Sequence, residues 1–169
     1  MTTLNYYCIL MLSFQSPNYC IKMKLSTRGR YGSRLLLDLA LHQEQGPVLL
    51  RDIAQRQQIH LPYLKHLIAP LVAGGILRSV RGAKGGLLLV KSPEQIKLRE
   101  VIQLLEGSLA PVECVIDPGL CEHSESCVTR DIWAELQKAM DGVLETTTLR
   151  DLMERQKEKT QPSALMYNI

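Results

Sequence analysis

The sequence contains no long hydrophobic segment. No uninterrupted apolar run approaches the roughly 18 residues that a membrane-spanning helix needs. Residues 4–14 have the length of a signal-peptide core, but no positive charge precedes them and no small-residue cleavage site follows them. We therefore expect neither membrane association nor secretion. Clustered thiols in a chain without a secretory signal suggest the reducing cytoplasm.

Patterns typical of enzymes are also missing. The four histidines form no readable catalytic spacing, and the cysteine-rich stretch offers no neighbouring pair of a base and a group that orients it. The glycine-rich segment 82–86 lacks the Gly-Lys-Ser/Thr ending of a phosphate-binding loop. We therefore expect a protein that is not an enzyme.

The charge is divided unevenly along the chain. Residues 22–99 contain fourteen Lys and Arg against four Asp and Glu, a net charge of +10. Residues 100–169 contain six Lys and Arg against thirteen acids, a net charge of −7, and the two values add to the overall +3. A basic first half indicates a module that binds a polyanion, followed by a module of another kind. Two solvated faces of opposite sign are the alternative.

The basic half has the pattern of three helices followed by a hairpin. Helices are predicted over residues 26–46, 50–58 and 62–74, and Pro70 should kink or shorten the third. Two strand-length apolar runs then flank the glycine-rich segment. Two short helices joined by a tight turn and followed by a β-hairpin are typical of a winged helix-turn-helix, whose second helix enters the DNA major groove.

The acidic half is predicted to be helical, so the fold class is mainly α with a small β-hairpin. A helix is expected over residues 99–106, and a long one after Cys127. The long helix carries a broad apolar stripe, which a small winged helix cannot cover, so we expect it to pack on a second copy in a homodimer. Packing on its own domain is the alternative. The stripe consists of Val128, Ile132, Leu136, Ala139, Met140, Val143 and Leu144.

These patterns suggest a division of the chain into five segments. Residues 1–22 form an N-terminal extension unlike the rest, and a translation start at Met23 stays open. The others are a winged helix-turn-helix domain (23–107), a cysteine loop (108–128), the dimerisation helix with a C-terminal helix (129–158), and a polar tail (159–169).

Cys114, Cys121 and Cys127 lie within fourteen residues. Their spacing, Cys-x6-Cys-x5-Cys, is too long for the Cys-x2-Cys pairs of ordinary zinc sites and redox motifs. The turn residues Pro118-Gly119 allow the loop to fold back so that three sulfurs converge. Three thiolates with one open position suit an iron–sulfur cluster better than a closed zinc site. A disulfide with one spare thiol, and small buried side chains, are the alternatives.

Four stretches resemble the IscR/NsrR type of winged-helix regulator: residues 24–31 (Lys-Leu-Ser-Thr-Arg-Gly-Arg-Tyr), 79–86 (Ser-Val-Arg-Gly-Ala-Lys-Gly-Gly), 104–107 (Leu-Leu-Glu-Gly) and 127–133 (Cys-Val-Thr-Arg-Asp-Ile-Trp). The resemblance covers about residues 23–157. It implies a homodimeric transcriptional regulator that binds a double-stranded DNA operator. It also implies an iron–sulfur cluster on the three cysteines, [2Fe-2S] in preference to [4Fe-4S], that changes the affinity for DNA.

The resemblance places the base-reading side chains on the second helix of the helix-turn-helix, and Arg81 of the wing in the minor groove, where a narrow groove concentrates negative potential. The metal ligands it implies are Cys114, Cys121 and Cys127. The predicted DNA-binding residues are Lys24, Arg28, His60, Tyr63, Lys65, His66, Arg81 and Lys84.

Three positions depart from the pattern that the resemblance implies. Lys65 stands where Glu is common, so a donor suited to guanine or phosphate replaces an acceptor from cytosine. Arg130 stands where some members have a ligating histidine, and Arg30 where others contribute an aspartate from the partner subunit. Neither arginine can ligate iron. His123, Glu122 or a small molecule could fill the fourth position.

Two other functions remain open. The winged helix could use its cysteines as a disulfide or zinc sensor. The chain could instead be an interaction module that controls an enzyme partner through its acidic half, with DNA binding that shows no sequence preference.

Overall fold

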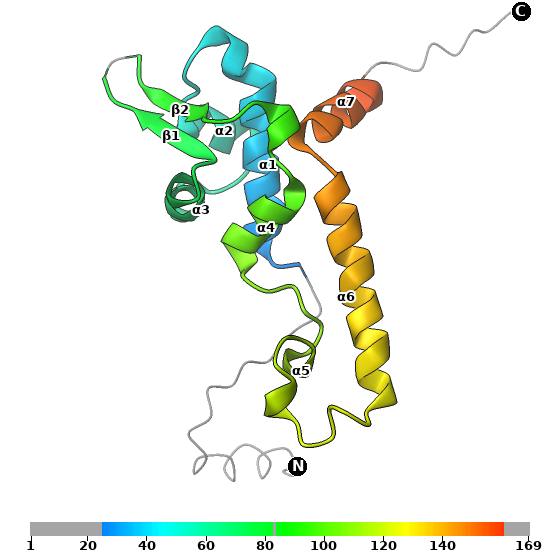
Figure 1. Ribbon diagram of the computed structural model, residues 1–169. Coiled ribbons are helices and arrows are strands. Elements are labelled where there is room, and N and C mark those ends of the chain that lie inside the picture. Colours follow the sequence, from blue (N-terminus) through cyan, green and yellow to red (C-terminus); the bar gives the residue numbers. More distant parts are fainter. Residues whose placement is uncertain (1–24, 83, 161–169) are drawn as a thin grey trace, which may run out of the picture.

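A computed structural model describes the chain over residues 25–82 and 84–160 (Figure 1). Seven α-helices and one two-stranded antiparallel hairpin make up this part of the chain, which confirms the predicted fold class. Lys24 and the N-terminal extension lie outside the described residues. No helix within the described ranges is long and apolar enough to cross a membrane.

The core lies among the helices α1 (Thr27–His42), α2 (Leu50–Gln57), α3 (Leu61–Ala73) and α4 (Leu98–Glu106). Apolar residues recur three and four positions apart on these helices, so that each helix buries one stripe against the others. The largest fully buried side chains are Leu35, Leu36, Leu39, Ile53, Leu64, Leu67, Leu71, Ile76, Leu77, Ile96, Leu105 and Leu149.

The turn between α2 and α3 is tight. Gln58, the C-cap residue of α2, adopts the left-handed conformation (φ 53°), and His60 is already the N-cap residue of α3. The helix-turn-helix predicted from the sequence is therefore present. α3 is not shortened at Pro70: it continues to Ala73, because a proline in the last turn removes only one backbone hydrogen bond near the end of the helix.

The wing consists of β1 (Leu77–Val80) and β2 (Gly86–Leu89). A third segment joins them, because Val48 exchanges two backbone hydrogen bonds with Leu87, at N···O distances of 3.0 and 2.8 Å. The position of Gly86 requires glycine, since a Cβ there would lie 2.6 Å from the Val48 carbonyl oxygen. The sequence pattern did not indicate this pairing, which is only one residue long.

Beyond α4 the chain leaves the winged-helix body and returns. The short α5 (Glu113–Ile116) and a 3-10 turn (Pro118–Leu120) precede the long helix α6 (Val128–Thr146), which leads back toward the body (Figure 1). α7 (Leu149–Thr160) packs against α1 and the 3-10 turn Pro93–Gln95. Its first residue, Leu149, is 1% exposed and belongs to the winged-helix core.

A short backbone ladder joins α6 and α7 to the start of α4. Leu98 donates its N–H to the Thr147 carbonyl (2.9 Å), and Leu149 donates to the Ile96 carbonyl (2.8 Å). α6 itself has no buried residue, so this junction fixes how the helix leaves the body. Three ion pairs surround the junction: Lys97–Glu145, Arg99–Asp141 and Glu94–Arg150.

The start of α7 depends on a capping box. Asp151 accepts hydrogen bonds from the Thr148 N–H and hydroxyl, both at 2.7 Å. The bond from the backbone N–H is the largest cause of a lowered Asp151 pKa, and the bond from the hydroxyl is the second. We expect Asp151→Ala to lower the melting temperature at neutral pH, because α7 frays and Leu149 loses its anchor.

The same variant makes a prediction about pH. A carboxylate whose pKa is lowered in the folded state stabilises the fold above its unfolded-state pKa, and this contribution is lost as the pH falls through the folded-state pKa. The difference in melting temperature between Asp151→Ala and the wild type should therefore shrink in strong acid, as measured by calorimetry. Glu158→Ala, at the exposed far end of α7, is the control. A gap that stays constant down to strong acid would contradict this reading.

Candidate nucleic-acid interface and cysteine loop

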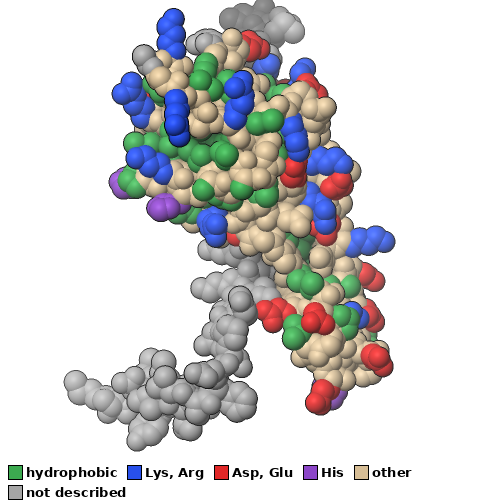
Figure 2. All heavy atoms as spheres, turned by 60° about the vertical axis from the view of Figure 1, so that its left-hand side comes forward, with side chains coloured by type: hydrophobic (Ala, Val, Ile, Leu, Met, Phe, Trp, Pro, Cys, Tyr) green, Lys and Arg blue, Asp and Glu red, His purple; other side chains and the backbone are tan. Residues whose placement is uncertain are grey.

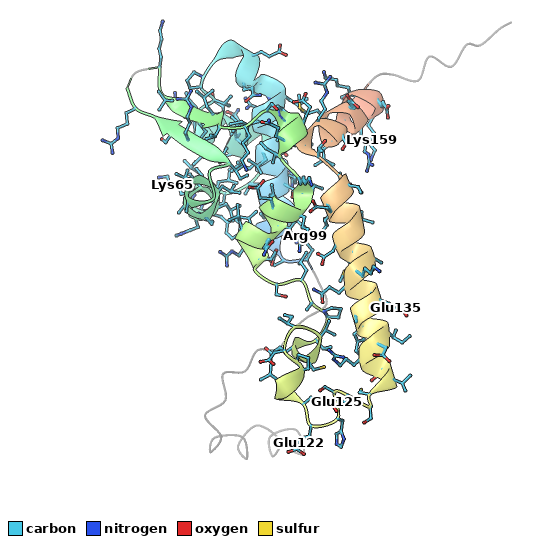
Figure 3. All side chains as sticks on the ribbon, in the orientation of Figure 1. Lys65, Arg99, Glu122, Glu125, Glu135 and Lys159 are labelled. Atoms are coloured by element: carbon cyan, nitrogen blue, oxygen red, sulfur yellow. The ribbon has the colours of Figure 1, made fainter. Side chains whose placement is uncertain are left out.

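α3 has one buried and one exposed face. Its leucines point into the core, whereas Lys65 and His66 are exposed, and His60 is exposed at the N-cap. Figure 3 shows Lys65 on the outer side of the helix, away from the body. The structure therefore brings three of the predicted DNA-binding side chains together at the start of one exposed helix face.

The side chain of Tyr63 contacts two residues of α1. Its hydroxyl lies 2.9 Å from the Thr27 hydroxyl, and its ring contacts the edge of Tyr31 with the centroids 5.7 Å apart. Tyr63 is half-buried, unlike Lys65 and His66. These contacts fasten the start of α3 to the start of α1, a link that sequence reasoning missed because the partners are 36 residues apart.

The remaining predicted cations lie on two other elements. Arg28 is exposed in the first turn of α1, and Arg81 and Lys84 are exposed at the tip of the wing. On the face drawn in Figure 2, Lys and Arg spread over the winged-helix body, and the opposite end shows mainly Asp and Glu. The charge division read from the sequence is thus also a division in space.

A buried carboxylate fastens α2 to α1. Asp38 has only 2% of its side chain exposed and accepts hydrogen bonds from Arg56, the shortest at 2.5 Å, and from Gln57 at 2.9 Å. The bonds to Asp38 are the largest cause of a raised Arg56 pKa. Arg34 in turn donates to the Gln57 side chain (3.0 Å). This network fixes the first helix of the helix-turn-helix, and no feature of the sequence pointed to it.

A second carboxylate caps α1 from the end of α4. Glu106 Oε1 accepts hydrogen bonds from the Ser26 N–H (3.1 Å), the Ser26 hydroxyl (2.7 Å) and the Gly29 N–H (2.7 Å). Negative charge at a helix N-terminus is favourable, because the unpaired N–H groups and the helix dipole are positive there. Glu106 directly precedes Gly107, where the chain turns toward the cysteine loop. It therefore joins the end of α4, after which the cysteine loop begins, to the start of α1.

The three cysteines are free and half-buried at the foot of α6. Cys114 lies in α5, Cys121 follows the 3-10 turn, and Cys127 caps α6. Within residues 25–82 and 84–160, no three His, Cys, Asp or Glu side chains are grouped closely enough to hold a metal ion. The expected convergence of three sulfurs is thus not formed in this part of the chain, where Cys114 lies within α5 and the 3-10 turn stands between α5 and Cys121.

The donors nevertheless suit a soft metal. Cys127 sits at the N-terminus of a 19-residue helix, as the sequence predicted. The Thr129 hydroxyl, 3.1 Å from Sγ, and the backbone N–H groups of Arg130 and Thr129 hold the pKa of the Cys127 thiol below its ordinary value. The chemistry of the donor set fits an iron–sulfur cluster, although the three sulfurs are not grouped in the described residues.

Comparison with known proteins is consistent with this geometry. Residues 25–155 match the Rrf2 family, described as iron-dependent transcriptional regulators. The chain is 47% identical over 131 residues to "Protein rrf2" of Nitratidesulfovibrio vulgaris, an alignment that covers 78% of this chain and 87% of that protein.

Two solved structures are similar in fold and sequence. The structure of T. potens IscR is matched with a TM-score of 0.71 and 38% identity, over 85% of this chain and 96% of that one. The structure of CymR, the global cysteine regulator of B. subtilis, is matched with a TM-score of 0.67 and 37% identity, over 78% and 97%. The winged-helix prediction and the expectation of a protein that is not an enzyme are confirmed. The chain belongs to the Rrf2 family of DNA-binding transcriptional regulators.

Proposed function

We propose that the chain is a homodimeric regulator that reads its operator with α3 and the wing, and whose affinity for DNA depends on an iron–sulfur cluster held by Cys114, Cys121 and Cys127. The observation that carries the DNA-reading part is the exposed face of α3, with Lys65 and His66 free to enter a major groove. Arg28, Arg81 and Lys84 supply positive charge on either side, suited to phosphates and the minor groove.

The second copy is needed to cover α6. Along this helix Val128, Ile132 and Val143 are 75%, 55% and 65% exposed, and they share one face. A stripe of exposed apolar side chains on a long helix is costly in water. Pairing two α6 helices would bury the stripe and place two copies of α3 on a two-fold-symmetric operator.

Lys65 is expected to read a base. Once an operator has been selected from random DNA, Lys65→Ala should weaken operator binding about tenfold, because a donor to guanine is lost. Binding to random DNA should change much less, as measured by fluorescence anisotropy at fixed salt. Lys138→Ala removes the same charge from exposed α6 and serves as the control. An equal loss on both DNAs would assign Lys65 to a phosphate.

The cluster proposal rests on three free cysteines in one loop, in a family described as iron-dependent. When bound, such a cluster supplies a redox-active iron centre that small molecules can attack. The protein contributes the thiols and the route from the loop to the reading helix. That route runs from Glu106 to Ser26 and Gly29 at the start of α1, and from Thr27 to Tyr63 on α3. Reordering the loop would thereby bias the placement of α3.

An anaerobic absorption spectrum with iron and sulfide assays tests the cluster. We expect freshly purified protein to be brown, and Cys114→Ala, Cys121→Ala and Cys127→Ala each to lose the visible bands, because three thiolates are needed. Ser126→Ala, at an exposed position of the same loop that carries no thiol, is the control and should keep them. Operator affinity should differ between the loaded and the cluster-free protein. A wild type that stays colourless after anaerobic reconstitution would rule the cluster out.

The alternative within the same fold is a thiol or zinc sensor. The similarity to CymR, the global cysteine regulator of B. subtilis, favours it. A colourless protein whose operator affinity changes with oxidant or with zinc, and loses that response in the cysteine variants, would select this function.

A further inference from the structure

Arg130 contacts the backbone of two of the three cysteines. Its side-chain Nε donates a hydrogen bond to the Cys114 carbonyl oxygen at 2.9 Å. Its backbone N–H donates to the Cys127 carbonyl oxygen at 3.0 Å. Arg130 is half-buried in the first turn of α6, so the side chain reaches across from α6 to α5. The Arg130 side chain thus ties Cys114 to the first turn of α6, which directly follows Cys127.

The other hydrogen bonds of the loop are local. Asp117 donates its N–H to the Glu113 carbonyl (2.9 Å), and Ser124 donates to the Cys121 carbonyl (3.0 Å), four and three residues away. The bond from Arg130 to Cys114 spans 16 residues. Local turns hold each piece of the loop in shape, but they do not bring its two ends together.

The charges of the loop make Arg130 distinctive. It is the one Lys or Arg between Arg99 and Lys138 in the sequence, in a stretch rich in carboxylates. Figure 3 shows Glu122 and Glu125 at the end of the loop, with Glu135 further along α6. Gathering three thiolates would add negative charge to this region, and a nearby cation lowers that cost, in addition to the hydrogen-bond donors at the start of α6. The carboxylates between residues 113 and 135 are Glu113, Asp117, Glu122, Glu125, Asp131 and Glu135.

We infer that Arg130 is a positioning residue, which straps Cys114 to the base of α6 and supplies the positive charge that lets the three cysteines gather around a metal centre. The strap, which is the hydrogen bond from the Arg130 side chain to the Cys114 carbonyl oxygen, is part of the described structure. Its use in loading rests on the proposed function. In this chain a residue unable to ligate iron thereby organises the ligands.

The strap is tested on cluster-free, full-length protein by hydrogen exchange. In Arg130→Ala we expect peptides covering residues 113–127 to exchange about tenfold faster, because the long-range bond is lost. Peptides from α1 report whether the fold as a whole is intact. Lys138→Ala, which removes the same charge from exposed α6, should leave the loop unchanged. Unchanged exchange in Arg130→Ala would overturn the strap.

Anaerobic reconstitution distinguishes the effect of the hydrogen bond from Arg130 to Cys114 from the effect of the positive charge of Arg130. We expect Arg130→Ala to take up less than half of the wild-type iron and sulfide, and Arg130→Lys, which keeps the charge but lacks the planar Nε donor, to fall between. Wild-type loading in Arg130→Ala, with a loosened loop, would overturn the loading role alone. If the wild type takes up no cluster, the proposed function fails, and the exchange experiment still decides the strap.

Discussion

Replacing Arg56 by alanine should destabilise the protein by about 3 kcal/mol, because a buried carboxylate is left without its cation. Asp38 is 2% exposed and accepts three hydrogen-bond contacts from Arg56, at 2.5 to 3.1 Å. Gln57 remains as a donor at 2.9 Å, but an amide does not neutralise the charge. Arg56 is itself 35% exposed, so some water can reach the gap, and we place the cost at the lower end of the range for broken buried pairs.

Denaturant unfolding followed by circular dichroism measures this loss. Arg51→Ala is the matched control: it lies on the same helix, is 75% exposed, and its carboxylate partner Asp52 is 3.7 Å away. The control should cost less than about 1 kcal/mol. Replacing Asp38 and Arg56 together by apolar residues should recover part of the stability, since no charge is then stranded. Equal, small losses in Arg56→Ala and Arg51→Ala would show that Asp38 does not depend on Arg56.

Glu106→Ala should both destabilise the fold, by about 2 kcal/mol, and weaken operator binding about tenfold. The variant removes an ionised acceptor of three hydrogen bonds from Ser26 and Gly29. The start of α1 is then free to fray. Thr27 lies in that turn and holds the Tyr63 hydroxyl, so the start of α3 loses its support. Glu106→Gln keeps one acceptor oxygen, so its stability and its operator affinity should fall between those of the wild type and Glu106→Ala.

Glu100→Ala separates this effect from a change in charge. Glu100 lies on the same helix as Glu106. Its carboxylate accepts a hydrogen bond from Lys91 Nζ at 2.7 Å and, within the described residues, none from α1. Its loss removes the same negative charge, so non-specific binding to DNA should change alike in both variants. Operator affinity in Glu106→Ala equal to that in Glu100→Ala would mean that the cap of α1 does not position α3.

Local patterns were sufficient for the elements of the DNA-reading module. The three-to-four spacing of leucines in α1, the tight turn before α3 and the glycine-rich tip between two apolar runs each act over a few residues, so a single sequence reveals them. The same holds for Cys127 at the N-terminus of α6 and for the break at residues 146–148. The predicted DNA contacts and cysteine ligands themselves remain predictions.

The tertiary structure decided which distant residues meet. Asp38 with Arg56, Glu106 with Ser26, and Thr27 with Tyr63 are separated by 18 to 80 residues, and no periodicity marks such pairs. The tertiary structure also placed α7 on α1, because Leu149 packs into the core of the winged-helix body. It left the three sulfurs ungrouped in the described residues, because the turns of the cysteine loop depend on the whole chain. Sequence alone determined the class of protein and its elements. Only long-range packing determined how the cysteine loop is connected to the helix proposed to read DNA.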